Sequence, residues 1–421
     1  MVPRFAVSAF LFIALTTAHG QTPKVYRTES PSARALTVLS SAYGLRELPD
    51  GSLLVNDTRA RRFVRLSADL SSTTVLADSI GSTSAKYPQY GIRLLIPYLA
   101  DSTLFVDNDA RVMLVVDPHG TITRAMAHPK QGDFSFFNQP FAGGPGVDSR
   151  GRLVYQGGRA ATRAARTASD AKSATPMTVD TTFVIAADLD TRMLDTIAPV
   201  FVARSSPIQI ATDPNGRIRA VARLTPVLPP TDLWTVRSDG VVAVLRAHDY
   251  HLELVRADGS HTAGPKMPFA WNRLTDADKR AKLDSVQRVL DSLRLAGSPF
   301  GRMIQSRSDA TGASRTDTVV PAVQFPTLTE IPDFIPPVRA GAMKADREGR
   351  VWILPTSTDD ASGGLRYDVA DRDGRLAMRV RIPLGRDVVG FGRNGTVYLG
   401  WYQQPDRVII ERVRLSSTPE R

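Results

Sequence analysis

Acidic residues at the ends of two short apolar runs are the first candidates for chemistry. Asp57 ends one run, and Asp107, Asn108 and Asp109 end another. Carboxylate and amide oxygens of this kind are the ligands that Ca²⁺ prefers in proteins. Asx side chains also stabilise turns, and Asp57 could pair with Arg59 on the same loop. The turn role is the favoured interpretation, and a Ca²⁺ site is the alternative.

The densest group of titratable residues is His248-Asp249-Tyr250-His251. Two His residues three positions apart on a loop could bind a metal or relay a proton. No third ligand can be identified from the spacing, so an ordinary polar loop is the favoured interpretation.

Aromatic residues offer a different kind of contact. Trp401 and Tyr402 adjoin each other, and residues 134–137 include three Phe. Such rings could stack on a sugar or a peptide. They could equally pack between repeated units of the fold.

Several catalytic classes are excluded by what the sequence lacks. The chain has no Cys, which rules out thiolate nucleophiles, zinc–thiolate sites and iron–sulfur clusters. It also lacks a G-x-S-x-G elbow, a P-loop, a dinucleotide-binding fingerprint and an H-E-x-x-H pair. We therefore expect no cofactor, with Ca²⁺ as the alternative.

The candidate residues must be positioned by a repeated unit of paired strands. Residues 343–384 contain two short hairpins, whose turns 346–349 and 371–374 begin with Asp and end with Gly. Asp can hydrogen-bond its own backbone, and Gly accepts the positive φ that such a turn needs. Related units begin roughly 50 residues apart where no insertion intervenes, which is the period of a propeller blade. The repeat predicts an all-β, six-bladed β-propeller, with two stacked β-sandwiches as the alternative.

Two insertions interrupt the repeats, at about residues 157–180 and 264–338. In the second, residues 275–295 show an apolar stripe at helical spacing and predict a helix. The rest of it, residues 298–337, is rich in Ser, Thr and Pro and predicts a loop. Residues 208–224 could form an extra hairpin or part of a blade.

The last repeat lacks a fourth strand, whereas an apolar run at residues 34–39 has no repeat of its own. We expect this N-terminal run to pair with residues 408–415 and to complete the last blade. Closing the ring in this way would remove two open sheet edges.

In this topology the loops after the second strands gather on one face of the ring. The candidate ligand-binding residues therefore lie around one mouth of the central channel. They are Asp57, Arg59, Asp107, Asn108, Asp109, His248, Asp249, Tyr250, His251, Trp401 and Tyr402.

Residues 1–20 predict a secretory signal peptide, because Arg4 precedes a short apolar run and Ala18-His19-Gly20 suits cleavage. No later segment is long and apolar enough to predict a transmembrane helix. We expect residues 21–421 to form a single soluble domain, periplasmic or secreted, and monomeric. The formal charge is +11, but the Arg residues are scattered, so no nucleic-acid interface is predicted.

Five segments resemble known bacterial proteins. Residues 44–57 and 346–352 look like blades of six-bladed propellers of the NHL-repeat and gluconolactonase-like group. Residues 239–250, 275–279 and 388–393 resemble an exported branch of that group, which has no general assigned reaction. A fold of this kind does not fix a function.

Two functions are considered: the absence of any strong catalytic constellation favours the first, and the acidic residues at the blade mouths motivate the second. The first is a non-catalytic exported propeller that binds an unidentified ligand or protein through loops at one face of the channel. The alternative is a Ca²⁺-assisted lactonase or ester hydrolase. Gluconolactonase-like relatives place a metal-binding Glu before a Gly at the start of the first blade, whereas this chain has Tyr43 before Gly44.

Overall fold

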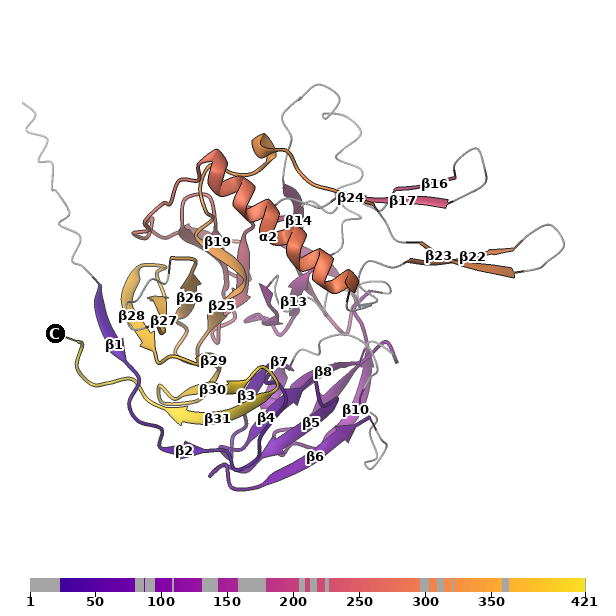
Figure 1. Ribbon diagram of the computed structural model, residues 1–421. Coiled ribbons are helices and arrows are strands. Elements are labelled where there is room, and N and C mark those ends of the chain that lie inside the picture. The colour runs from indigo at the N-terminus through magenta and orange to yellow at the C-terminus, as the bar shows by residue number, and fades with distance from the viewer. Residues whose placement is uncertain are drawn as a thin grey trace, which may run out of the picture.

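The computed structural model describes most of the chain beyond residue 22. The described residues are 23–79, 87, 95–107, 110–130, 143–157, 179–203, 209–212, 218–223, 227–295, 303–308, 314–319, 322–357 and 363–420. Six of the sheets within them are blades of a β-propeller arranged around one axis (Figure 1). The predicted six-bladed fold is therefore confirmed.

Each of the first three blades is a four-stranded antiparallel meander. Blade 1 contains β3 (Leu45–Glu47), β4 (Leu53–Asp57), β5 (Arg62–Leu66) and β6 (Thr73–Asp78). Blade 2 contains β7 (Leu95–Pro97), β8 (Thr103–Asp107), β9 (Val112–Val116) and β10 (Ile122–Ala127). Blade 3 contains β12 (Gly146–Val147), β13 (Leu153–Gln156), β14 (Val179–Ala187) and β15 (Leu194–Ala203).

The last three blades each recruit a strand from elsewhere in the chain. Blade 4 contains β18 (Leu233–Val236), β19 (Val242–Arg246), β20 (His251–Val255) and β21 (His261–Ala263), with β11 (Gly143–Gly144) parallel to β18. Blade 5 contains β25 (Val338–Ala345), β26 (Val351–Pro355), β27 (Leu365–Ala370) and β28 (Leu376–Ile382), with β1 (Lys24–Arg27) parallel to β28. Blade 6 contains β29 (Arg386–Phe391), β30 (Val397–Gln404), β31 (Arg407–Val413) and β2 (Ala33–Arg34).

The Asp-x-x-Gly turns form as predicted. Gly349 adopts φ +79°, and its N–H donates to the Asp346 carbonyl at 3.3 Å. The Asp346 side chain also accepts the backbone N–H of Arg350 at 2.8 Å. Asp and Gly at these two positions thus fix the first turn of blade 5, because Gly adopts positive φ without steric cost.

The hydrophobic core lies between the blades. Trp352 and Val369 of blade 5 pack with Val388 and Leu399 of blade 6 in one fully buried cluster. Val154 of blade 3 similarly belongs to a cluster with β18 and β19 of blade 4. Because the neighbouring blade covers each face, the strands read as nearly continuous apolar runs.

The N-terminal segment closes blade 6, as predicted. Ala33 and Arg34 pair antiparallel with Arg412 and Glu411 of β31, and Leu39 forms a separate bridge. Figure 1 shows the indigo β2 beside the yellow β31. Strand β1, which precedes it, lies beside β28 of blade 5.

The second insertion contains the predicted helix, α2 (Asp276–Leu295). Thr275 caps it: its hydroxyl accepts the backbone N–H of Asp278 at 3.2 Å, and the Asp278 carboxylate accepts the Thr275 N–H at 2.8 Å. A capping box of this kind fixes where the helix begins. Within the described residues, no helix combines the length and apolarity needed to cross a membrane.

The remainder of the insertion contains strands where the sequence predicted a loop. Strands β22 (Met303–Ser308) and β23 (Ser314–Val319) form a hairpin. Strand β24 (Ala322–Gln324) joins β16 (Gln209–Thr212) and β17 (Ile218–Arg223) in a separate three-stranded sheet. Residues 209–223 are thus an extra hairpin outside the blades, and Figure 1 shows both hairpins extending away from the ring.

Candidate functional site

The first strands of all six blades line one cavity on the propeller axis, with a volume of about 880 Å³. Its two ends differ in chemistry. The turn end lies where the first strand of each blade turns into the second, and the connection end lies where one blade leads into the next.

The turn end is basic. Arg46 of β3, Arg237 after β18 and Arg347 after β25 all line the cavity there, together with Asp101. Lys344 of β25 lines the same wall. With Arg339 near the connection end, five cationic residues line the cavity against three acidic ones among the residues that the structure describes.

Arg46 joins blade 1 to blade 2. Its side chain is buried, with the residue only 5% exposed. Nη1 donates to the Ser102 carbonyl and to Thr103 Oγ1, and Nη2 donates to the Asp101 carbonyl at 3.1 Å. Nε has no hydrogen-bond partner. Burial, and after it the charge of Arg347, lower the pKa of Arg46 to about 10, although the charge of Asp101 acts in the opposite direction.

The acidic residues of the lining are largely engaged. Asp346 accepts hydrogen bonds from Arg350 Nε at 2.6 Å and from Trp352 Nε1 at 2.9 Å. Asp387 accepts the Tyr367 hydroxyl at 2.5 Å. Asp101 lies 3.6 Å from Arg393. These carboxylates therefore interact with other groups of the protein. The hydrogen-bond donors that the cavity offers to a ligand belong mostly to its cationic residues.

The connection end carries two phenols, Tyr43 and Tyr402, which are each 38% exposed. Burial and the nearby Asp387 raise the pKa of Tyr402 to about 12, so its hydroxyl is neutral and can donate a hydrogen bond at physiological pH. Of the predicted candidate residues that fall within the described ranges, Tyr402 is the one that lines the cavity.

Trp401 lies elsewhere. The guanidinium groups of Arg34 and Arg386 stack on its ring, with their central carbons 5.4 and 5.0 Å from the ring centre. Both guanidinium groups belong to the same blade as Trp401, so these cation–π contacts stabilise the closed sixth blade internally.

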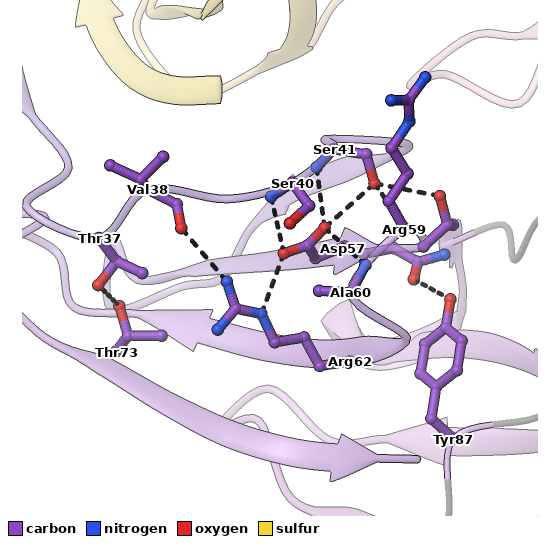
Figure 2. Close-up of polar contacts among 12 residues, drawn as sticks. Thr37, Val38, Ser40, Ser41, Asp57, Arg59, Ala60, Arg62, Thr73 and Tyr87 are labelled. Carbon is purple, nitrogen blue, oxygen red and sulfur yellow. Dashed lines mark hydrogen bonds and ion pairs between the residues drawn. The ribbon is translucent and has the colours of Figure 1, made fainter. Parts of the chain in front are cut away.

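Asp57 holds the chain that enters blade 1, as Figure 2 shows. Its carboxylate accepts the backbone N–H groups of Ser40 at 3.1 Å and Ser41 at 2.8 Å, and Arg62 Nε at 3.0 Å. The predicted partner Arg59 is not the one found: its side chain points away from Asp57 (Figure 2). Arg62 takes that place because strand pairing sets it directly opposite Asp57.

The other acidic segment is only partly described. The Asp107 carboxylate accepts the backbone N–H of Ala110 at 3.0 Å, as expected of a turn. Asn108 and Asp109 lie outside the described residues, and so do the Phe residues at 134–137.

The His248–His251 segment forms a polar cluster beside blade 4, away from the cavity lining. His251 Nδ1 lies 2.5 Å from an Asp249 carboxylate oxygen, and Lys266 lies 3.2 Å from the other. Burial alone would raise the pKa of Asp249, but the hydrogen bonds from His251 and Lys266 lower it overall. Tyr250 is fully buried and donates to Asp368 at 2.8 Å, so it is a packing residue.

The lining does not fit a calcium site. Ca²⁺ takes six to eight oxygen ligands, several of them carboxylate. The three lining carboxylates sit at different ends of the cavity, and two of them accept protein hydrogen bonds. Among the described residues, no group of three His, Asp or Glu side chains is placed to hold a metal.

Arg46 and Lys344 lie within first strands and Arg347 lies on the first turn of blade 5, whereas the sequence candidates came from the loops after second strands. Charged residues within first strands are a partial signal, because they are costly to bury without partners. Arg46 and Lys344 fit this signal, but Glu47 does not, since it is buried and accepts hydrogen bonds from blade 6.

No protein-family model and no curated protein matches this chain. Among solved structures, it is similar to an exported protein from Bacteroides fragilis, with 8% identity, a TM-score of 0.43, and coverage of 94% of this chain and 100% of that one. A gluconolactonase from Xanthomonas campestris gives 12% identity, a TM-score of 0.39, and coverage of 94% of this chain and 96% of that one. Virginiamycin B lyase from Staphylococcus aureus gives 12% identity, a TM-score of 0.37, and coverage of 90% of this chain and 99% of that one. Likeness at this level carries no conclusion about activity.

Proposed function

We propose that this chain is an exported binding protein that takes a small organic ligand in its axial cavity. The cavity itself carries the proposal: a volume of about 880 Å³ is within the range of ligand sites in proteins, roughly 300–1,000 Å³. Its lining combines apolar strand residues with a few polar groups at each end, which is also typical of such sites.

Binding without catalysis is favoured by the residue types on the walls. No His lines the described part of the cavity, and no carboxylate there is paired with a nucleophile. A general base needs a free group within hydrogen-bond reach of its target. The second candidate function, a Ca²⁺-assisted lactonase, is supported by the family resemblance but requires carboxylates that the lining does not gather.

Export is part of the same proposal. The pattern of residues 1–20 supports it, and these residues lie outside the described part of the chain. We propose action in the periplasm or outside the cell.

The test is to fill the cavity. Ala340 is exposed within the lining, and Trp at that position would occupy the space a ligand needs. Ala125, exposed on the outer strand β10, provides a matched control. Thermal unfolding would be followed with a panel of neutral sugars, lactones, nucleosides and amino acids.

We expect at least one class of compound to raise the Tm of the wild type and of A125W, but not of A340W. Stabilisation of A340W equal to that of the wild type would contradict the proposal. So would the absence of stabilisation by every compound, including the anions considered below. Turnover of δ-gluconolactone with Ca²⁺ that A340W abolishes would favour the lactonase instead.

A further inference from the structure

We propose that the ligand carries an oxyanion, a carboxylate or a phosphate, which binds at the turn end between Arg46, Lys344 and Arg347. This inference rests on the proposed function, because it assigns the chemical class of the molecule in the same cavity. It predicts an organic anion whose uncharged body extends along the axis toward Tyr43 and Tyr402.

The first argument is the convergence of positive charge. Arg46 belongs to blade 1, Arg347 to the first turn of blade 5 and Arg393 to the first turn of blade 6, yet their charges act on one another. Like charges brought together in a partly buried place repel, and a protein gains nothing from this arrangement unless an anion compensates it. Asp101, the acid whose charge acts on Arg46, already faces Arg393 at 3.6 Å.

The second argument is an unused donor. Arg46 is only 5% exposed, like many core residues. Its Nη1 and Nη2 donate hydrogen bonds to blade 2, whereas its Nε has no acceptor among the described residues. A buried donor without an acceptor destabilises the folded protein, because it has lost its hydrogen bonds to water. An oxyanion at this wall of the cavity would supply the acceptor that the protein does not.

The third argument concerns the neighbours of that donor. Arg347 donates through Nη2 to the Glu47 carbonyl at 2.9 Å, but no described carboxylate forms an ion pair with it. Lys344 also has no ion pair within the described residues. Arg237 differs, because Asp239 and the Arg372 carbonyl already occupy its guanidinium. Arg347 and Lys344 are therefore the cations with donors to spare.

Glu47 is the acid closest in sequence to Arg46, and its carboxylate is directed toward blade 6. It accepts the backbone N–H of Arg393 at 3.0 Å and the Tyr398 hydroxyl at 2.6 Å. It is thus held by other donors and does not accept a hydrogen bond from Arg46 Nε.

The test compares three probes that share a ring: phenyl phosphate, benzoate and the uncharged benzyl alcohol. Calorimetric titration would measure each against the wild type and R347Q. The control is R375Q, since Arg375 lies on another turn of blade 5, with its side chain 68% exposed and outside the lining. Arg46 joins two blades and is left unchanged, so K344Q serves as the second site variant.

We expect at least one anionic probe to bind the wild type and R375Q tenfold or more tightly than benzyl alcohol. R347Q should lose about tenfold in affinity, the loss of one charge-assisted hydrogen bond, and K344Q should lose affinity in the same direction. Added NaCl should weaken binding to the wild type. The stronger of the two anions identifies the head group as phosphate or carboxylate.

Equal affinity of R347Q and the wild type for the anions would overturn the inference, as would a failure of both anions to bind. If benzyl alcohol or the neutral panel still binds in a manner that A340W blocks, the proposed function survives and only the anion assignment fails. If nothing binds to the cavity, both fail.

Discussion

Leu39 and Val408 exchange both of their backbone hydrogen bonds, with N···O distances of 2.9 Å and 2.8 Å. Their side chains are 1% and 0% exposed and belong to the core cluster between blades 1 and 6. One pair of residues from opposite ends of the chain thus contributes both sheet pairing and core packing at the point where the ring closes.

Truncating Leu39 should therefore destabilise the whole protein. L39A removes a fully buried side chain and should lower the free energy of unfolding by about 2–5 kcal/mol. Urea unfolding followed by circular dichroism would measure it. L36A is the control, because Leu36 in the same segment is 77% exposed and should change stability by no more than about 0.5 kcal/mol. Equal effects of the two variants would contradict the closure role.

Asp57 should stabilise the fold through its hydrogen bonds. The destabilisation caused by removing its carboxylate should therefore be the same with and without Ca²⁺. D57A leaves two backbone N–H groups and the Arg62 guanidinium without their acceptor, at about 1–3 kcal/mol for each buried donor. R59A should be neutral within about 0.5 kcal/mol, because that side chain is exposed. Thermal unfolding with and without Ca²⁺ would check both. A Ca²⁺-dependent rise in Tm that D57A abolishes would instead support an ion site.

Gly143 should tolerate no side chain. A Cβ at this position would lie 2.1 Å from the Trp234 ring of the neighbouring strand. G143A should therefore cost about 1–3 kcal/mol or more through overpacking between β11 and β18. The effect should shrink in a W234L background, where the ring is absent, and a double-mutant cycle would measure this coupling. Additive effects would show that the ring is not the cause.

Glu253 should make stability depend on pH in the acid range. The hydrogen bond from Arg246 lowers the pKa of Glu253 below its ordinary 4.5, despite partial burial. Because the folded pKa is the lower one, the stabilisation is complete above the unfolded pKa and is lost as pH falls through the folded pKa. E253Q should thus be less stable than the wild type at pH 7, and the difference should decline below about pH 4.5.

The measurement for Glu253 is urea unfolding at pH 7, 5 and 3. D373N provides the comparison, since Asp373 is 73% exposed and lies 3.5 Å from Arg375 on the surface. A difference between E253Q and the wild type that stays constant across these pH values would show that Glu253 contributes no charge-dependent stability.

Much of the fold could be predicted from the sequence, because local chemistry and the repeat agree. The Asp-x-x-Gly turns fix the hairpins, and the unmatched run near Leu39 indicated where the ring closes. Strand β1 could not be predicted in this way. It is four residues long, and its place depends on distant partners such as Glu420, whose carboxylate pairs with Arg27. Pairing with residues so distant in the chain leaves no recognisable pattern in the sequence of β1 itself.

The candidate site was harder to predict than the fold. Polar loop residues were chosen for their chemistry, yet Asp57 and Asp249 engage donors of the protein itself. Which strand residues face the axis depends on side-chain alternation and on how six blades converge, and neither is a property of a short motif. Tyr402 was found because candidates were sought at the ends of second strands, and it lies near the end of β30, whereas Arg46 lies within the first strand β3.

The closure of blade 6 also constrains how this chain is made. Strand β2 is synthesised before blade 1, whereas its partner β31 follows β30 of blade 6. Strand β2 therefore stays unpaired while the intervening blades are made, and a chain halted before β31 would display a bare strand edge in blade 6, which is a hazard for aggregation. The two-residue length of β2 limits the edge that the waiting segment itself presents.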